Sequence, residues 1–249
     1  MGTIYLVGAG PGAPDLLTLR AARVLERADI VFHDALVHPD VVALAARAER
    51  VAVGKRCHRH STAQRFINKR LVDAAGTHEV VVRLKGGDPM LFGRAQEEID
   101  TLEAAGIAYE VVPGVTAALA ASAELGVSLT RRGLSRNVVF ATPRVGHNQS
   151  ESDWVASVLA ADTAAIYMGA GQADAVASAL IARGRAPCTP VALAENVSLP
   201  SFRVRYGTLA ELPHLGAGVG PAVILLGEVL RERWVAWREA TQRPVATAA

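Results

Sequence analysis

The chain has 249 residues, of which 51% are hydrophobic, so it is long enough and apolar enough for one large domain or two smaller ones. Charged residues make up 20% and the formal net charge is only +2, which excludes general disorder and argues against nucleic acid as a partner. Two cysteines without metal-ligand spacing indicate free thiols in a reducing cytoplasm, and no apolar run reaches the roughly 18 residues that would predict a membrane span.

The first half of the chain alternates predicted strands and helices. The predicted strands are residues 3–7, 30–32, 51–53, 79–84 and 109–112, and the predicted helices are residues 16–27, 39–47, 62–75 and 92–105. Asp15 is the expected cap of the first helix, and Pro39 opens the second. Such regular alternation predicts a largely parallel sheet with helices on both of its faces. Because a strand begins at Thr3, we expect no signal peptide.

The second half has a different pattern, which begins at Pro113-Gly114. An alanine-rich helix is predicted at residues 115–124, and strands are predicted at residues 138–142, 164–167, 189–193, 202–206 and 222–226. Gly207, Pro213 and several further glycines separate the last two strands, which favours a mixed sheet with antiparallel pairs. We therefore predict an α/β fold of two domains, residues 1–113 and residues 114–249.

The strongest functional signal is Gly86-Gly87-Asp88-Pro89, which follows the fourth predicted strand. Adjacent glycines allow the backbone to approach a ligand closely, and Asp88 places a carboxylate beside that backbone. A glycine loop at residues 8–12, Asp34 and Lys55 follow other strands. Since the carboxyl ends of parallel strands meet at one edge of a sheet, these groups predict a shared ligand cleft. The alternative is that Asp34 caps the next helix and Lys55 is merely solvated.

The glycine loop at residues 8–12 invites comparison with a dinucleotide-binding motif, but it fits that motif poorly. Position 13 is alanine, and Pro11 stands where a helix N-terminus should offer N–H groups to a pyrophosphate. A turn shaped for another ligand, or for domain packing, is the better interpretation.

Two polar segments have weaker functional claims. Residues 57–60, Cys-His-Arg-His, are too closely spaced for a common tetrahedral site, so we predict a polar loop and no metal. Arg131, Arg132 and Arg136 form a basic patch that could bind an anionic substrate or simply face the solvent.

Together these motifs resemble those of the tetrapyrrole methylase superfamily, and most closely those of its methyltransferases that act on uroporphyrinogen III. The resemblance covers about residues 4–229. Its carriers are V-G-A-G-P-G at 7–12, D-A-L-V at 34–37, V-G-K-R at 53–56, R-L-K-G-G-D-P at 83–89, F-G-R at 92–94, V-P-G-V-T-A-A at 112–118, Y-M-G at 167–169 and E-N at 195–196. Each motif alone is weak, but their order and spacing are specific.

The resemblance implies S-adenosylmethionine as the cofactor, no metal, an active-site cleft between the two α/β domains, and a homodimer. The implied reaction is two successive C-methylations of uroporphyrinogen III, which give precorrin-2. By the same resemblance, the cofactor pocket would be lined, largely through backbone, by Pro11, Gly86, Gly87, Asp88, Leu91, Thr116, Ala117, Met168 and Val197.

The resemblance also assigns roles to charged side chains. Asp34 matches the proton acceptor proposed for the family, and Lys55 matches the proposed proton donor. The residues associated with the tetrapyrrole substrate are matched by Arg94, Glu97, Arg132 and Met168. The carboxylates of such a substrate need arginine forks. Asp34 or Glu97 could take a proton or stabilise positive charge on the ring, so Glu97 and Arg94 count among the catalytic candidates.

The sequence departs from the family pattern within several of these motifs. Ala95-Gln96 replace a pair of glycines, Arg131 stands where histidine is frequent, Pro143-Arg144 replace Gly-His, and Val197-Ser198 replace Gly-Thr. These changes leave open a later precorrin methyltransferase of the cobalamin route. From another class, a non-catalytic module that binds the cofactor or a tetrapyrrole also stays open. Neither nucleic acid nor a membrane is expected as a partner.

Overall fold

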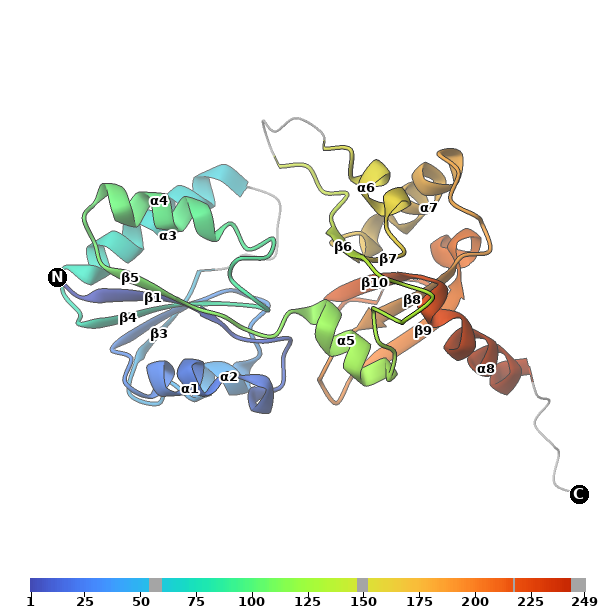
Figure 1. Cartoon of the computed structure of the whole chain (residues 1–249). Helices are drawn as coiled ribbons and strands as arrows, with labels where there is room; N and C mark the ends of the chain where they lie inside the picture. The colour runs from blue at the N-terminus through green and yellow to red at the C-terminus, as the bar shows by residue number, and fades with distance from the viewer. Residues whose placement is uncertain (54–59, 147–151, 217, 243–249) are drawn as a thin grey trace, which may run out of the picture. The chain divides into compact units, whose positions relative to one another are not determined.

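A computed structural model describes residues 1–53, 60–146, 152–216 and 218–242 of the chain (Figure 1). The chain divides into two compact units, Met1–Ala120 and Ala121–Ala249, and each contains one five-stranded sheet. Helix α5 (Ala117–Leu125), which follows the predicted domain boundary at Pro113, runs across the division between the units. Among the described residues, no helix combines the length and the hydropathy needed to cross a membrane.

The sheet of the first unit is entirely parallel, as the alternating pattern predicts. Its strands are β1 (Thr3–Gly8), β2 (Ile30–His33), β3 (Glu49–Ala52), β4 (Val80–Lys85) and β5 (Tyr109–Val112). They lie in the order β3-β2-β4-β1-β5, and every neighbouring pair is parallel. The carboxyl ends of β2, β4, β1 and β5 are therefore neighbours along one edge of the sheet.

Helices cover both faces of this sheet (Figure 1). Helices α1 (Leu19–Glu26) and α2 (Pro39–Ala43) lie on one face, and α3 (His60–Ala75) and α4 (Ala95–Ala104) lie on the other. Side chains of successive strand residues pack into two different cores, because they alternate between the two faces of the sheet. In β1, Ile4 and Leu6 pack with α3 and α4, whereas Val7 packs with α1 and α2.

The first helix begins later than predicted. A 3-10 turn, η1 (Pro14–Leu16), precedes α1, and the Thr18 side chain accepts a hydrogen bond from the N–H of Ala21 at 3.2 Å. Thr18 is therefore the cap, and the prediction of Asp15 as the cap is wrong. Asp15 lies inside η1, ahead of the position from which a side chain can bond to the first turn of α1.

Two further helices are shorter than predicted. Helix α4 begins at Ala95 rather than at Phe92, because Phe92 and Arg94 adopt left-handed backbone conformations with φ of 52° and 55°. Helix α2 begins with Pro39, as predicted, but ends at Ala43.

The second unit has the mixed sheet that the sequence predicts. Its strands are β6 (Val138–Ala141), β7 (Thr163–Tyr167), β8 (Pro190–Glu195), β9 (Arg203–Thr208) and β10 (Ala222–Gly227), in the order β6-β7-β10-β8-β9. Strands β6 and β7 are parallel, and the other neighbouring pairs are antiparallel. Because β7 and β8 both run antiparallel to β10, their carboxyl ends lie at the same edge.

Helices also pack against this second sheet. Helices α6 (Trp154–Ala160) and α7 (Ala173–Ala182), with the 3-10 helix η3 (Leu209–His214), bury their apolar side chains in one core with the strands. Helix α8 (Arg231–Gln242) contacts β8 and β9, and the Trp237 ring lies 6.2 Å from the Tyr206 ring. Short 3-10 turns, η2 (Ala170–Gln172) and η4 (Glu228–Leu230), lead into α7 and α8.

Candidate functional site

Three loops at the carboxyl edge of the first sheet meet through glycine backbone. Gly10, after β1, and Gly87, after β4, exchange two backbone hydrogen bonds of 2.8 and 3.2 Å. A Cβ on Gly8 would lie 2.6 Å from the Gly114 nitrogen, and a Cβ on Gly114 would collide with the Gly87 carbonyl oxygen. Glycine is therefore required here, so that the exits of β1, β4 and β5 can approach one another.

Asp88 ties two of these loops together. Its Oδ2 accepts the N–H of Gly114 at 2.9 Å, and its Oδ1 accepts the N–H of Met90 at 2.8 Å. The carboxylate thus joins the exit of β4 to the exit of β5 and closes the turn at Pro89. Gly87, directly before Asp88, has a φ of 68°, a left-handed conformation that glycine adopts without strain.

The junction gathers the predicted cofactor-binding positions of the first unit. They lie in the loops after β1, β4 and β5 or at the start of α5, and they are Pro11, Gly86, Gly87, Asp88, Leu91, Thr116 and Ala117. Gly86 is exposed, and the Thr116 Cα lies 4.0 Å from the point where a Cβ on Gly87 would stand. Backbone from separate parts of the sequence therefore comes together here, and its binding of a cofactor stays a prediction.

The other predicted cofactor positions belong to the second unit. Met168 follows β7 and Val197 lies just after β8, so both lie at the same edge of that sheet. Met168 has a φ of 56° and is 41% exposed. Val197 is buried between Asn196 and Ser198, which also have positive φ. Left-handed conformations strain residues other than glycine, and such residues concentrate at functional sites.

Asp34 follows β2 and is held by an ion pair. Its Oδ1 accepts a hydrogen bond from Arg83 Nη2 at 2.5 Å, while its side chain remains 30% exposed. The alternative that Asp34 caps the next helix is wrong, because the His38 side chain accepts the N–H of Asp40 at the start of α2. The Asp34 carboxylate is therefore both anchored and accessible.

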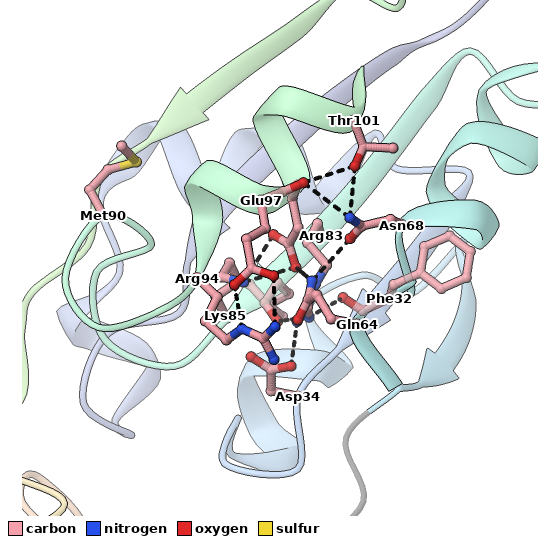
Figure 2. Close-up of polar contacts among 12 residues, drawn as sticks. Phe32, Asp34, Gln64, Asn68, Arg83, Lys85, Met90, Arg94, Glu97 and Thr101 are labelled. Carbon is pink, nitrogen blue, oxygen red and sulfur yellow. Dashed lines mark hydrogen bonds and ion pairs between the residues drawn. The ribbon is translucent and has the colours of Figure 1, made fainter. Parts of the chain in front are cut away.

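A buried cluster of charged side chains adjoins Asp34 (Figure 2). Glu98 Oε1 accepts hydrogen bonds from Arg83 Nε at 3.0 Å and from Gln64 Nε2 at 3.1 Å. Glu98 Oε2 accepts one from Lys85 Nζ at 2.9 Å. Arg83, Lys85 and Glu98 are each at most 2% exposed. Burial of these charges is tolerable because each one is paired and hydrogen-bonded.

None of the predicted site residues except Asp34 belongs to this cluster, although the sequence contains a signal for it. Arg83 and Lys85 stand two residues apart in an otherwise apolar strand, so their side chains share one face of the sheet. Val81 precedes them on that face and packs with α3 and α4. Two cations on a buried face require carboxylates nearby, and Glu98 of α4 is one of them.

The cluster shifts the pKa of both cations. Burial tends to lower the pKa of Arg83, but Asp34 and Glu98 together raise it above its ordinary value. Burial and the neighbouring Arg83 charge lower the pKa of Lys85, and Glu98 and Asp34 offset this only in part. Arg83 is therefore a permanent cation beside Asp34.

Arg94 and Glu97 pair at the exposed start of α4. Arg94 Nε and Nη2 donate to the two carboxylate oxygens of Glu97 at 2.6 and 2.7 Å. These hydrogen bonds raise the pKa of Arg94, against a smaller opposing effect of burial. Exposed pairs of this kind contribute little to stability.

Arg132 and Lys55 complete the predicted set of site residues. Arg132 is exposed in a turn of the second unit, and the neighbouring Arg131 pairs with Glu232 at 2.8 Å. Lys55 and residues 57–59 lie outside the described residues. In the part of the chain that the structure describes, no three or more His, Cys, Asp or Glu side chains gather as a possible metal site.

Comparison with known protein sequences points to one family. The family model of the tetrapyrrole (corrin/porphyrin) methylases matches residues 3–213. Siroheme synthase of Azotobacter vinelandii is 45% identical over 247 residues, which are 97% of this chain and 53% of that protein. Siroheme synthase of Chromobacterium violaceum is 48% identical over 236 residues, 92% of this chain and 50% of that protein. The chain thus spans about half the length of these curated relatives.

Two solved structures are similar over nearly the whole chain. A uroporphyrin-III C-methyl transferase from Thermus thermophilus, complexed with S-adenyl homocysteine, has a TM-score of 0.82 and 40% identity, covering 93% of this chain and 100% of that one. A cobalt precorrin-4 methyltransferase of cobalamin biosynthesis has a TM-score of 0.77 and 26% identity, covering 92% and 95%. These similarities confirm the predicted α/β fold, with its parallel first sheet and mixed second sheet.

Proposed function

Since the chain belongs to the family of tetrapyrrole (corrin/porphyrin) methylases, we propose that it is a methyltransferase that uses S-adenosylmethionine to convert uroporphyrinogen III to precorrin-2. One observation carries this proposal: the chain matches all of the Thermus thermophilus uroporphyrin-III C-methyl transferase at 40% identity. The precorrin-4 methyltransferase matches at only 26% identity, so it supports the fold more than the substrate.

The junction of the first unit suits this cofactor. When bound, S-adenosylmethionine supplies an electrophilic methyl group to a nucleophilic pyrrole carbon of the substrate. The exposed backbone at Gly86 and the glycine conformation at Gly87 allow the chain to approach a polar ligand closely. Asp88 holds that backbone to Gly114, so the cradle is preorganised. In the second unit, Met168 and Val197 are proposed cofactor-binding residues on the resemblance alone.

We assign the proton acceptor role to Asp34. Methylation of a pyrrole carbon leaves the ring with a proton to lose, and a partly exposed carboxylate can accept it. Arg83 holds Asp34 from the buried side, which limits the positions that the carboxylate can occupy. Lys55 is the proposed donor, on the resemblance alone.

Arginine side chains are proposed to bind the carboxylates of the tetrapyrrole. The guanidinium of Arg94 already holds a carboxylate with two hydrogen bonds, that of Glu97, which shows the geometry that a substrate carboxylate could adopt. Arg132 is exposed and could serve in the same way, while Met168 offers an exposed apolar contact. The resemblance also supports a cytoplasmic protein that forms a homodimer. Light scattering of the purified protein would measure its oligomeric state.

A different tetrapyrrole is the second candidate substrate. The departures at Ala95-Gln96 adjoin Arg94 and Glu97, where the substrate is proposed to bind. Ala95 is buried and Gln96 donates to Asp100 at 2.8 Å, so these substitutions are built into the first turn of α4. If this segment determines which tetrapyrrole binds, the protein would methylate a later precorrin in place of uroporphyrinogen III.

The purified protein should be incubated with uroporphyrinogen III and S-adenosylmethionine that carries a labelled methyl group. We expect two labelled methyl groups in each tetrapyrrole product, and Asp34→Asn should reduce their appearance. Binding of the cofactor without label in any tetrapyrrole would refute the catalytic proposal and favour the binding module. A parallel incubation should offer a later precorrin as the substrate. Label in its product, with none when uroporphyrinogen III is offered, would favour the second candidate.

A further inference from the structure

Glu98 of α4 is a buried carboxylate with three hydrogen-bonding partners. It is fully buried, and its carboxylate accepts hydrogen bonds from Arg83, Lys85 and Gln64. Lys85 Nζ bonds to both oxygens, at 3.0 and 2.9 Å. Burying an isolated carboxylate costs several kcal/mol, so its presence here depends on these partners.

Arg83 connects Glu98 to Asp34. Its Nε faces Glu98, its Nη2 faces Asp34, and its Nη1 donates to the carbonyl oxygens of Phe32 and Leu84 at 3.4 and 3.2 Å. A guanidinium is planar and rigid, so the bond at Nε helps to fix the direction in which Nη2 points. The Glu98 carboxylate therefore influences the place of Asp34, which it does not touch.

The charges of the cluster balance. Arg83 and Lys85 supply two positive charges, and Asp34 and Glu98 supply two negative charges. Glu98 shares both cations, so it offsets part of the positive charge that Asp34 would otherwise meet alone. Around the cluster, Arg94 and Glu97 pair with each other, and His33 Nδ1 lies 3.3 Å from the Asp34 carbonyl oxygen.

We propose that Glu98 is a positioning residue for methyl transfer. It fixes Arg83 so that this guanidinium holds the Asp34 carboxylate toward the substrate, and it keeps the charge around that carboxylate balanced. The inference rests on the proposed function, in which Asp34 accepts the proton. In this proposal Glu98 acts on the reaction through Arg83, and Lys85 is the second cation that Glu98 neutralises.

Three variants test this idea: Glu98→Gln, Lys85→Met and the double variant. Glu98→Gln leaves two cations facing Asp34 alone, and we expect kcat to fall about 10- to 100-fold, a part of what a general base contributes. The substrate KM and the cofactor Kd should change less than about twofold, because the loops after β1, β4 and β5 keep their contacts. A purely structural role would instead lower thermal stability and leave kcat and its pH dependence unchanged in the folded fraction.

The pH profile of kcat shows whether the net charge of the cluster, rather than the loss of packing in the variants, affects the reaction. The acid limb should move to lower pH in Glu98→Gln, because the cluster gains net positive charge, and to higher pH in Lys85→Met, because it gains net negative charge. The double variant restores the balance, so its limb should lie close to that of the wild type. Acid limbs that coincide in all four proteins would overturn the proposal. If Glu98→Gln does not fold, an unshifted acid limb in Lys85→Met overturns it.

A measurement without turnover keeps this inference distinct from the proposed function. The side-chain Nε–H signal of Arg83, assigned in nitrogen-15 spectra with Arg83→Lys, should exchange slowly with water in the wild type and faster in Glu98→Gln. Unchanged exchange in the variant would show that Glu98 does not hold Arg83. If the wild type methylates no uroporphyrinogen III, the proposed function fails, whereas the exchange result still tells whether Glu98 fixes Arg83.

Discussion

Both carboxylate oxygens of Asp88 are engaged with backbone N–H groups, those of Met90 and Gly114. Because both oxygens are already hydrogen-bonded, we expect Asp88 to affect ligand binding mainly by fixing the position of the backbone around it. The sequence shows an acid beside two glycines, which is typical of a ligand-binding loop. Only the structure shows that the partner of this acid is Gly114, on a strand exit 26 residues further along the chain.

We expect Asp88→Ala to weaken the binding of S-adenosylhomocysteine by about 10- to 100-fold, because two charge-assisted hydrogen bonds between the loops are lost. Isothermal titration calorimetry would measure the change. Asp88→Asn keeps an acceptor oxygen and should have an intermediate Kd. Unchanged affinity in the alanine variant would show that this loop has another role.

Arg132 is expected to act on the substrate alone. Arg132→Ala should raise the substrate KM about tenfold, because one guanidinium fork for a carboxylate is removed, while the Kd of the cofactor stays as it was. Steady-state kinetics and calorimetry together measure both constants. Arg20→Ala is the control, since Arg20 pairs with Glu110 on an exposed surface at 3.2 Å. An equal KM in the two variants would remove Arg132 from the substrate site.

At the scale of elements, the candidate site is formed where the loops that follow β1, β4 and β5 contact one another. The exits of β1, β4 and β5 approach so closely that a Cβ at Gly8 or Gly114 has no space. The order β3-β2-β4-β1-β5 makes β1 the neighbour of both β4 and β5, which is why these particular loops meet. Glycine at the junction is thus a packing requirement, whatever ligand the loops bind.

Gly114→Ala should lower the free energy of unfolding by about 1–3 kcal/mol, because the new methyl group overlaps the Gly87 carbonyl and forces the loops apart. Thermal unfolding followed by circular dichroism would measure the loss, and cofactor affinity should fall with it. The control is Gly171→Ala, where a Cβ meets nothing within 4 Å and the change should stay within about 0.5 kcal/mol. A stable Gly114→Ala variant would contradict the close approach of these loops.

At the scale of the whole molecule, each unit buries its own core, and the first unit also buries a balanced group of charges. Arg83 and Lys85 come from β4, Glu98 and Gln64 from the two helices that cover that face of the sheet, and Asp34 from the exit of β2. Hydrogen bonds therefore join the sheet to α3 and α4. Such a cluster couples the stability of the protein to pH.

The pKa of Lys85 is lowered in the folded protein, so between that lowered value and its ordinary 10.5 the unfolded chain binds more protons at this residue. The contribution of Lys85 to stability therefore rises with pH across this window. We expect the Tm of the wild type minus that of Lys85→Met to increase as the pH rises toward 10.5. Lys69→Met, which removes an exposed lysine, is the control, and a constant or falling difference for Lys85 would contradict the prediction.

Much of the fold could be predicted from the sequence, because strands and the helices between them leave a local pattern. The strand of residues 109–112 is found as predicted, and both sheets have the predicted character. Helix starts were harder to predict, since they depend on backbone conformation. Thr18 rather than Asp15 caps α1, and left-handed Phe92 and Arg94 delay α4.

By itself the sequence determined the family, the positions of the strands along the chain and the polar residues that follow them, because motif spacing and hydrophobic periodicity are properties of short segments. The order of the strands within each sheet came from the structure. Only the tertiary structure decided which of these residues touch. Asp34, Arg83 and Glu98 are far apart along the chain, and they meet because β2, β4 and α4 pack together. The pairing of buried charges depends on which faces the folded sheet and helices turn toward each other, and no short segment of sequence contains that information.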